Sequence, residues 1–489
     1  MSGLQRTEPF ECYGLGLFAW SVTQMGDLSD LSVLGTIDRL SFISCDDLRS
    51  LGEASVFDGL DVRAFVAGTP WELRDVSALA GLSSLRTLKI DGAMALRDLS
   101  PLSGLTQLEH LDLNGVAAVD ITPLAPLSGL EHLDLSNCDA LTDLSALRSM
   151  TGLRHLNLSS CNALSDLSPL GSLLALETLK ASSHGLKDCD AFAPLGSLRV
   201  LKLDGESLGN IEGLGSLESL KTLTLSSDAL TDISPLSRLV GLKRLTLKAK
   251  SLQDLTPLAG LSSLTYLCIS GCDSLTDLTP LEALTGLTHV EVTFCGSLTD
   301  LSPLSKLPSL RDLDLTRCTA LEAFNGLSGA PALKTLNARA CHALEDLSEL
   351  RDISTLEELG LRKCFALTSL SGLESHEGLT SLNCISCRAL DDVEALASMT
   401  GLKKLLLDDC RAVASVPSLV ALTRLSTLGL SGCESLSQLT CLTSLPGLTK
   451  LDLSGCLELG SPSSWAPHSL VRRGGRTSTR SCAQRAAAA

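Results

Sequence analysis

Cysteine is the residue type in this chain whose regular spacing most suggests a chemical role, such as a disulfide or a metal site. A cysteine or a substitute recurs every 22 or 23 residues, always five residues after one leucine-like residue and three after another. Seventeen residues occupy this position: Ala93, Val116, Cys138, Cys161, His184, Glu206, Asp228, Lys250, Cys272, Cys295, Cys318, Cys341, Cys364, Cys387, Cys410, Cys433 and Cys456. A fixed place in a repeat indicates burial as a small apolar side chain with a weak S–H donor, so we expect free thiols and no disulfide framework.

A CxxC pair, Cys384 and Cys387, has the spacing of redox and zinc sites. Cys384, however, takes the place of a core leucine, and Cys387 occupies the recurring cysteine position. We therefore expect both side chains to point into the core and to do neither chemistry. Cys268 lies outside the recurring position, and it is the thiol that we expect to be exposed.

Three histidines share one position in consecutive repeats. His110, His132 and His155 each precede a central leucine, and Asp112, Asp134 and Asn157 follow two residues later. Because adjacent strands lie ~4.8 Å apart, the three imidazoles would stack beside two carboxylates. Such a row could hold a metal ion or act as a pH-sensitive contact. Duplication of the segment LEHLDL without selection for histidine explains the row equally simply, so we expect no metal site.

The outward-facing positions change in character between residues 266 and 411. In most repeats they are Ser, Thr, Asp or Gly, but here they include aromatic residues and arginines, the types enriched at interface hot spots. The residues predicted to bind a partner are Tyr266, His289, Glu291, Phe294, Asp314, Arg317, Arg339, Arg362, Lys363, Arg388 and Arg411. Cations grouped in an acidic protein indicate a protein partner with an acidic or phosphorylated surface. The alternative is an ordinary solvated face that varies freely.

The elements that position these residues can be read from one repeat, residues 264–284 (LTYLCISGCDSLTDLTPLEAL). Leu267 and Ile269 alternate with polar neighbours, which is typical of a short half-buried strand. Thr279 and Pro280 then favour a helical turn, with the hydroxyl as N-cap acceptor. The segment before the next strand is too short for a long helix, which favours 3₁₀ or one-turn helices.

The repeats at His184, Glu206, Asp228 and Lys250 lack one turn residue, so residues 180–255 should differ in twist or curvature.

A repeat this short cannot bury its apolar face alone, so copies must stack into one continuous core. The unit LxxLxLxxC/NxxLxDLxPL resembles the leucine-rich repeat family, and its DLSPL form is similar to the SDS22-like and internalin-like subclass. The resemblance implies an α/β solenoid, a gently curved horseshoe with a parallel concave sheet, that binds a protein partner. It also extends to trypanosomatid leucine-rich proteins described as adenylate cyclase regulators. We expect a cap-like or degenerate segment over 1–35, the solenoid over 36–460 and a disordered basic tail over 461–489.

Composition narrows the function further. The net charge of −17 argues against a general role in binding nucleic acid or anionic membranes. No stretch approaches the ~20 apolar residues of a membrane span, and the start of the chain lacks the pattern of a secretory signal. We found no phosphate-binding loop, dinucleotide fingerprint, nucleophile elbow or HExxH motif. The sequence thus favours a non-catalytic cytoplasmic or nuclear scaffold without cofactor or small-molecule substrate. The alternatives are a regulatory subunit of a phosphatase or adenylate cyclase, and a surface recognition protein.

Overall fold

The computed structural model describes residues 17–21, 36–43, 49–52, 57, 60–417, 419–439, 442 and 445–459. The chain divides into two compact units, Met1–Leu242 and Lys243–Ala489, which we call unit 1 and unit 2. The predicted basic tail and most of the predicted cap lie outside the described residues. Within the cap segment, residues 17–21 form a strand that pairs with the next one. The domain boundaries stay predictions.

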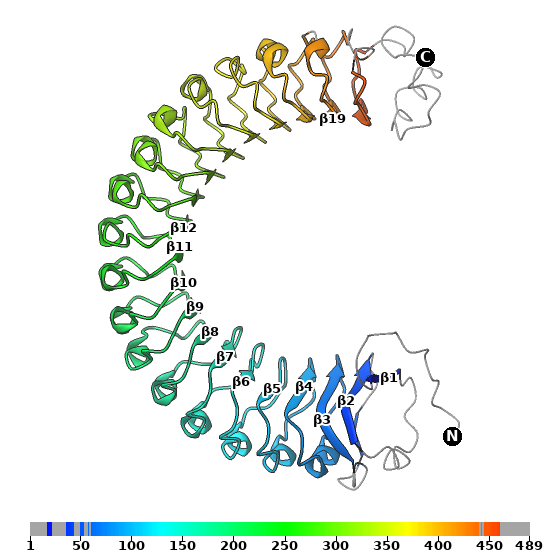
Figure 1. Ribbon diagram of the computed structural model, residues 1–489, viewed down its shortest axis with the longest axis vertical. Coiled ribbons are helices and arrows are strands. Elements are labelled where there is room, and N and C mark those ends of the chain that lie inside the picture. The colour runs from blue at the N-terminus through cyan, green and yellow to red at the C-terminus, as the bar shows by residue number, and fades with distance from the viewer. Residues whose placement is uncertain are drawn as a thin grey trace. The chain divides into compact units, whose positions relative to one another are not determined.

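Each unit is a stack of short parallel strands, one for each repeat (Figure 1). Unit 1 contains β1 (Leu17–Ser21), β2 (Thr36–Ile43), β3 (Asp61–Gly68), β4 (Thr87–Asp91), β5 (His110–Asp112), β6 (His132–Asp134), β7 (His155–Leu158), β8 (Thr178–Ser182), β9 (Val200–Asp204) and β10 (Thr222–Ser226). Unit 2 contains β11 (Arg244–Lys248), β12 (Tyr266–Ser270), β13 (His289–Thr293), β14 (Asp312–Asp314), β15 (Thr335–Asn337), β16 (Glu358–Gly360), β17 (Ser381–Asn383), β18 (Lys404–Leu406), β19 (Thr427–Gly429) and β20 (Lys450–Asp452). Equivalent residues are register partners, as Leu267 and Val290 are on β12 and β13.

Single 3₁₀ turns cover the side opposite the sheet, as predicted (Figure 1). In unit 1 they are η3 (Ser77–Gly81), η4 (Ser100–Leu102), η5 (Thr122–Leu124), η6 (Ser145–Ser149), η7 (Ser168–Ser172), η8 (Asp190–Phe192), η9 (Glu212–Ser216) and η10 (Ser234–Arg238). In unit 2 they are η11 (Thr256–Leu258), η12 (Thr279–Ala283), η13 (Ser302–Lys306), η14 (Leu327–Gly329), η15 (Ser348–Leu350), η16 (Glu394–Ser398) and η17 (Leu419–Ala421). Among the described helices, none is long and apolar enough to cross a membrane.

The start of these turns differs from the prediction in one respect. The hydroxyl of the Ser or Thr before proline does not cap the turn, because that residue is already its first member. The acceptor is the aspartate two residues earlier: Asp98 Oδ1 accepts from the Ser100 amide at 2.8 Å, and Asp277 Oδ1 from the Thr279 amide at 2.8 Å. The aspartate of the DLSPL motif therefore has a structural task, which is to satisfy an amide at the start of the turn.

The recurring cysteines are buried, as predicted, and each of the fourteen described cysteines is a free thiol. Most of their S–H groups donate to a carbonyl oxygen of the preceding repeat: Cys318 to Val292 at 3.1 Å and Cys341 to Leu315 at 3.1 Å. Each such bond satisfies a buried acceptor and joins two neighbouring repeats. Burial raises the pKa of Cys138 to about 12, so the thiol is unreactive as a nucleophile.

Cys268 is not exposed, so that expectation was wrong. It lies on β12 between Tyr266 of its own strand and its register partner Glu291 on β13. The Tyr266 hydroxyl donates to Glu291 at 2.8 Å, and the two side chains leave Cys268 with 7% of its surface exposed. Burial raises the pKa of the Cys268 thiol to about 12.

The four shorter repeats turn differently from the others. In the cysteine repeats, the residue before the cysteine has a left-handed backbone, for example Arg317 with φ 62° and Lys363 with φ 63°. The corresponding residues of the short repeats, Ser183, Gly205, Ser227 and Ala249, do not have positive φ, and they are the residues that face the core. The occupants assigned from sequence, His184, Glu206, Asp228 and Lys250, are exposed instead. Because the left-handed residue is missing, the residue that faces the core comes one position earlier in the chain. The prediction from sequence therefore placed the core-facing residue of these four repeats one position too late.

Candidate functional site

The predicted partner-binding residues all belong to unit 2, where they occupy two kinds of position. One set lies on the strands: Tyr266 on β12, His289 and Glu291 on β13, and Asp314 on β14. The other set lies in the turn around the buried cysteine. Phe294, Arg317, Arg339, Arg362 and Lys363 precede the cysteine, and Arg388 and Arg411 follow it directly. The left-handed residue before the cysteine turns the chain and directs Phe294, Arg317 and Lys363 away from the core.

The residues of the strand set are held by contacts with one another and with neighbouring residues on the same strands and on β11. The Arg244 guanidinium lies 3.8 Å from the centre of the Tyr266 ring, and the Tyr266 hydroxyl donates to Glu291. His289 Nε2 lies 2.8 Å from Asp312 Oδ2. Burial, and then the hydrogen bond to Glu291, raise the pKa of Tyr266 well above its usual range, so the phenol stays a neutral donor. These charges already have partners.

The turn set contains four cations without such partners. Arg317, Arg339, Arg362 and Lys363, which we call the arginine cluster, have no carboxylate at ion-pair distance within the part of the chain that the structure describes. They lie in three adjacent repeats, since the Arg317 amide donates to the Arg339 carbonyl at 2.8 Å and the Ala340 amide donates to the Arg362 carbonyl at 2.7 Å. Arg362 Nε is buried, and no described residue accepts a hydrogen bond from it.

Two aromatic rings accompany the arginine cluster. Phe294 is 45% exposed and lies 5.1 Å from the Arg317 guanidinium. Phe365 is 39% exposed and stacks on His342 with 4.9 Å between ring centres. Sequence reasoning missed Phe365 and His342, although both follow a recurring cysteine directly, as Arg388 and Arg411 do. The usual residues at that position are small or polar, so the aromatic ring was the available signal.

Arg388 and Arg411 differ from the arginine cluster because they share a counterion. Arg388 Nε and Nη2 donate to Asp409 Oδ2 at 3.0 and 2.9 Å, and Arg411 Nε donates to Asp409 Oδ1 at 2.8 Å. Burial acts to raise the pKa of Asp409, but the hydrogen bonds from both guanidinium groups outweigh it, and the pKa is lowered. The carboxylate therefore stays ionised and neutralises much of this charge.

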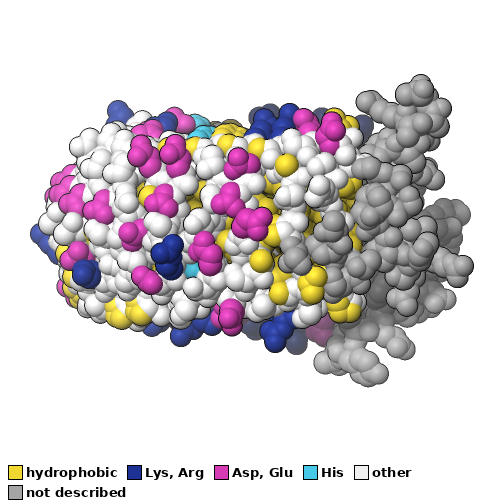
Figure 2. Space-filling view, turned by 90° about the horizontal axis from the view of Figure 1, so that it is seen from above, with side chains coloured by type: hydrophobic (Ala, Val, Ile, Leu, Met, Phe, Trp, Pro, Cys, Tyr) yellow, Lys and Arg dark blue, Asp and Glu magenta, His cyan; other side chains and the backbone are white. Residues whose placement is uncertain are grey.

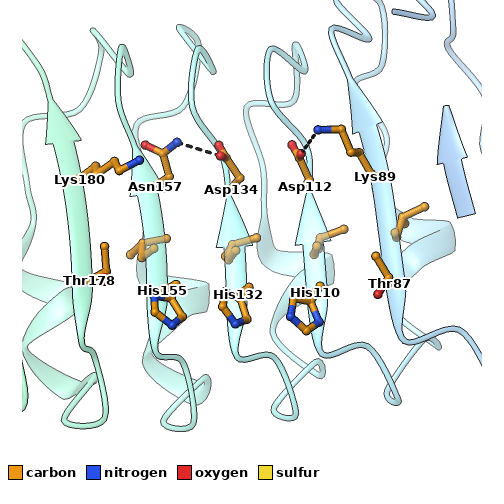
Figure 3. A pocket seen from close by; sticks show the side chains of 14 residues that line it. Thr87, Lys89, His110, Asp112, His132, Asp134, His155, Asn157, Thr178 and Lys180 are labelled. Atoms are coloured by element: carbon orange, nitrogen blue, oxygen red, sulfur yellow. Dashed lines mark hydrogen bonds and ion pairs between the residues drawn. The ribbon is translucent and has the colours of Figure 1, made fainter. Parts of the chain in front are cut away.

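The histidine row in unit 1 forms as the register predicted (Figure 3). The ring centres of His110 and His132 are 4.3 Å apart and those of His132 and His155 are 4.1 Å apart, with the planes within 13° of parallel. Parallel stacked rings do not aim their nitrogen lone pairs at one point. Among the described residues, no group of three or more His, Cys, Asp or Glu side chains could hold a metal ion.

A second row of polar side chains runs beside the histidines, and the two rows together line a shallow hollow of about 440 Å³. Lys89 Nζ lies 2.8 Å from Asp112 Oδ2, and Asn157 Nδ2 donates to Asp134 Oδ2 at 2.8 Å (Figure 3). Burial, and then the charges of His155 and His110, lower the pKa of His132, so the central imidazole is neutral near pH 7.

Acidic side chains are spread over the face of the molecule shown in Figure 2, and Lys and Arg are sparse there. This matches the net charge of −17. The arginine cluster therefore gathers positive charge locally in a protein whose net charge is negative.

Comparisons with known proteins address the repeat directly. Residues 128–172 match the family described as leucine-rich repeats in two copies. A solved leucine-rich repeat protein of Leptospira interrogans aligns with 80% of this chain and 95% of its own, at 18% identity and a TM-score of 0.60. The chain has the leucine-rich repeat fold. A solved internalin of Listeria monocytogenes aligns with 73% of this chain and 83% of its own, at 24% identity and a TM-score of 0.43. The comparison with curated proteins found no match.

The leucine-rich repeat fold confirms the predicted solenoid of parallel strands and short 3₁₀ turns. Leucine-rich repeat proteins generally act as protein-interaction scaffolds, and their folds are typically non-enzymatic interaction modules. The similarity to trypanosomatid proteins stays a prediction. Which surface of this chain is used, and by what, is a matter for proposal.

Proposed function

We propose that this leucine-rich repeat protein is a non-catalytic interaction scaffold, and that the face of unit 2 between Tyr266 and Arg411 binds a protein partner. The observation that carries the proposal is the arginine cluster. Four cations lie in three consecutive repeats of an acidic protein without a described counterion, and the buried Arg362 Nε has no described acceptor. Cations whose charge is not already neutralised can bind the carboxylates or phosphates of a partner without first breaking an ion pair.

The chemistry of the arginine cluster selects an acidic or phosphorylated segment of the partner. Guanidinium groups bind carboxylates and phosphates through paired, charge-assisted hydrogen bonds. The exposed rings of Phe294 and Phe365 supply the apolar contacts that typically accompany arginine at interface hot spots. A partner that offers an acidic stretch beside an apolar side chain would match both.

Preorganisation is the mechanism. Backbone hydrogen bonds tie the turns of Arg317, Arg339 and Arg362 to one another, so the backbone from which these side chains extend is fixed before a partner arrives. Association then loses less conformational entropy than it would with a mobile loop.

We also propose that the protein works in a reducing compartment, the cytoplasm or the nucleus. The fourteen described cysteines are free and buried, and most of those at the recurring position use the S–H group as a structural donor. Oxidation would remove that donor from each bond. Mass spectrometry of native material would check this: alkylation only after unfolding is expected, and native disulfides at these positions would contradict it.

The test of the interaction is affinity capture from native cells with the wild-type chain and the Arg339→Glu/Arg362→Glu variant. Arg339 is exposed and Arg362 is half-buried, and neither belongs to the leucine core, so we expect the variant to fold and to lose the partners that the wild type retains. The matched control is Lys306→Glu/Arg351→Glu, which makes the same change of charge on the 3₁₀ side of unit 2. Equal capture by the wild type and the Arg339→Glu/Arg362→Glu variant would contradict the proposed site.

A further inference from the structure

The histidine hollow of unit 1 is bordered by charges, most of which are paired. Before the strands, Arg86 pairs with Glu109, and Arg154 Nη1 lies 2.6 Å from Glu177 Oε1. On the strands, Lys89 pairs with Asp112. These three pairs cancel, so they give the hollow no net charge.

Two further charged groups, Asp134 and Lys180, line the hollow, and two others, Glu131 and Lys202, lie beside it. Glu131 is exposed beside His132, and Asp134 lies across from it. The oxygens of Asp134 are already occupied, because Oδ1 accepts from the Ser136 amide at 2.8 Å and Oδ2 accepts from Asn157. A new cation would therefore have to displace existing donors at Asp134.

The remaining two groups are Lys180 and Lys202, which are register partners on β8 and β9. Neither has a carboxylate at ion-pair distance within the described part of unit 1. Two ammonium groups on adjacent strands repel one another until an anion lies between them. In Figure 3 Lys180 lies beside Asn157, at the end of the row that runs along the histidines. This end of the hollow is open to a negative group.

We propose that the histidine hollow is a second binding surface, which takes an extended acidic peptide segment of a protein partner across β5–β9 and binds it more tightly as the pH falls. Lys180 and Lys202 anchor the segment at any pH. His110, His132 and His155 present their ring edges along the hollow, and each protonation adds one positive charge to a surface whose other unpaired charges are Glu131, Asp134, the two lysines and Asp204, which follows Lys202 on the same face of β9.

The direction of the pH dependence follows from linkage. An imidazole titrates near pH ~6.5, and stacked imidazoles oppose one another's protonation. A bound carboxylate favours the protonated form, so binding takes up protons and the affinity must rise as the pH falls through the histidine pKa values. The central His132 charges last, because burial and both neighbours lower its pKa.

The hollow lies in unit 1, and the arginine cluster lies in unit 2, so this inference does not rest on the proposed function. The test uses the full chain with Arg339→Glu/Arg362→Glu, which removes binding of acidic ligands at the arginine cluster. The probe is a fluorescein-labelled peptide of ten aspartates, which stays ionised over the range used. Its dissociation constant would be measured by fluorescence anisotropy at pH 6.0 and pH 8.0.

We expect binding to be roughly tenfold tighter at pH 6.0, which corresponds to a total histidine pKa change of about one unit. Replacing all three histidines by glutamine should remove this difference, and His184→Gln, at an exposed histidine outside the hollow, should keep it. Lys180→Ala/Lys202→Ala should weaken binding at both pH values. The absence of binding at either pH, or a pH dependence that survives in the triple histidine variant, would overturn the proposal.

The triple histidine variant could lose binding because it fails to fold. A second measurement therefore uses the chain with its histidines intact. NMR titration of the imidazole protons should show higher pKa values for His110, His132 and His155 when the peptide is present, and no change for His184. Identical titration curves with and without the peptide would also overturn the proposal.

Discussion

The histidine row of unit 1 and the arginine cluster of unit 2 are built on the same repeat, but the cations beside them differ in whether they are paired. In unit 1, Arg86, Arg154 and Lys89 each pair with a carboxylate near the histidine row. In unit 2, Arg317, Arg339 and Arg362 lie at the surface without a described counterion, and the neighbouring Arg388 and Arg411 share Asp409. Pairing, rather than the presence of arginine, therefore distinguishes a surface that is ready to bind anions from one that must first be protonated.

The difference between paired and unpaired arginines should produce the largest effect. Against a captured partner, we expect Arg339→Ala/Arg362→Ala to weaken binding by about 100-fold or more, as for two hot-spot residues. Arg388→Ala/Arg411→Ala should weaken it by less than about tenfold, because these guanidinium groups already share a carboxylate. Calorimetric titration would measure both. An equal loss in the two variants would break the distinction.

The buried donors offer a second way to sharpen the comparison. Cys341→Ala removes the S–H donor to the buried Leu315 carbonyl, which keeps its hydrogen bond from the Cys318 amide at 3.1 Å, so we expect the free energy of unfolding to fall by about 0.5–1.5 kcal/mol. In the short repeats of unit 1 a serine does the same work, since Ser227 Oγ donates to the Glu206 carbonyl at 3.2 Å. Ser227→Ala should therefore cost a comparable amount in urea unfolding. A neutral Cys341→Ala would show that the thiol serves only to fill space.

The histidines of the two units also differ in burial. Those of the histidine row in unit 1 line a surface hollow, whereas one histidine of unit 2 lies in the core. His376 is 1% exposed at a place that other repeats fill with leucine, isoleucine, methionine or alanine, and no described residue bonds to its ring nitrogens. We expect His376→Leu to raise the free energy of unfolding by about 1–2 kcal/mol, because it removes two unsatisfied buried polar atoms.

The same residue predicts a pH dependence of stability. Burial lowers the pKa of His376 in the folded state, so the unfolded chain binds a proton more readily. Wild-type stability should therefore fall as the pH drops below ~6.5, the value in the unfolded chain. His376→Leu should show a smaller fall over that range in thermal unfolding. An identical fall in both proteins would assign the acid sensitivity to other groups.

The smallest expected effect separates the two kinds of turn. Ser386 has a left-handed backbone with φ 62°, so Ser386→Gly should stabilise by about 0.5–1 kcal/mol. Ala249 occupies the equivalent position of a short repeat without positive φ, and Ala249→Gly should destabilise by about the same amount. Chemical denaturation would measure the two changes. The same sign for both would contradict the difference in turn conformation.

The fold was largely predictable because the apolar positions recur at a fixed spacing, which determines how neighbouring strands align. Leu267, Ile269, Cys272 and their equivalents fix which side of each strand is buried, and adjacent copies fix the strand order. The short repeats could not be aligned correctly in the same way. The spacing between leucines shows that each short repeat has one residue fewer. It does not show which residue is missing, and the structure identifies it as the one with the left-handed backbone. The inward position therefore moved from His184 to Ser183 without a sign in the spacing.

The candidate surfaces were only half predictable. Residue type identified Arg339 and Arg362 and the histidine row, since repeats in register place equivalent residues side by side. Which charges cancel depends on contacts between repeats, such as Arg388 with Asp409, 21 residues away. Lys180 and Lys202 were missed because each is ordinary alone, and they matter only as register partners without a carboxylate.

Hydrogen–deuterium exchange of the full chain with and without its captured partner tests the central claim most directly. The proposed binding face predicts slower exchange in the complex for residues 289–294, 312–317, 335–340 and 358–363, with the 3₁₀ turns of unit 2 unchanged. Protection confined to those turns, with no change at the arginine cluster, would contradict it.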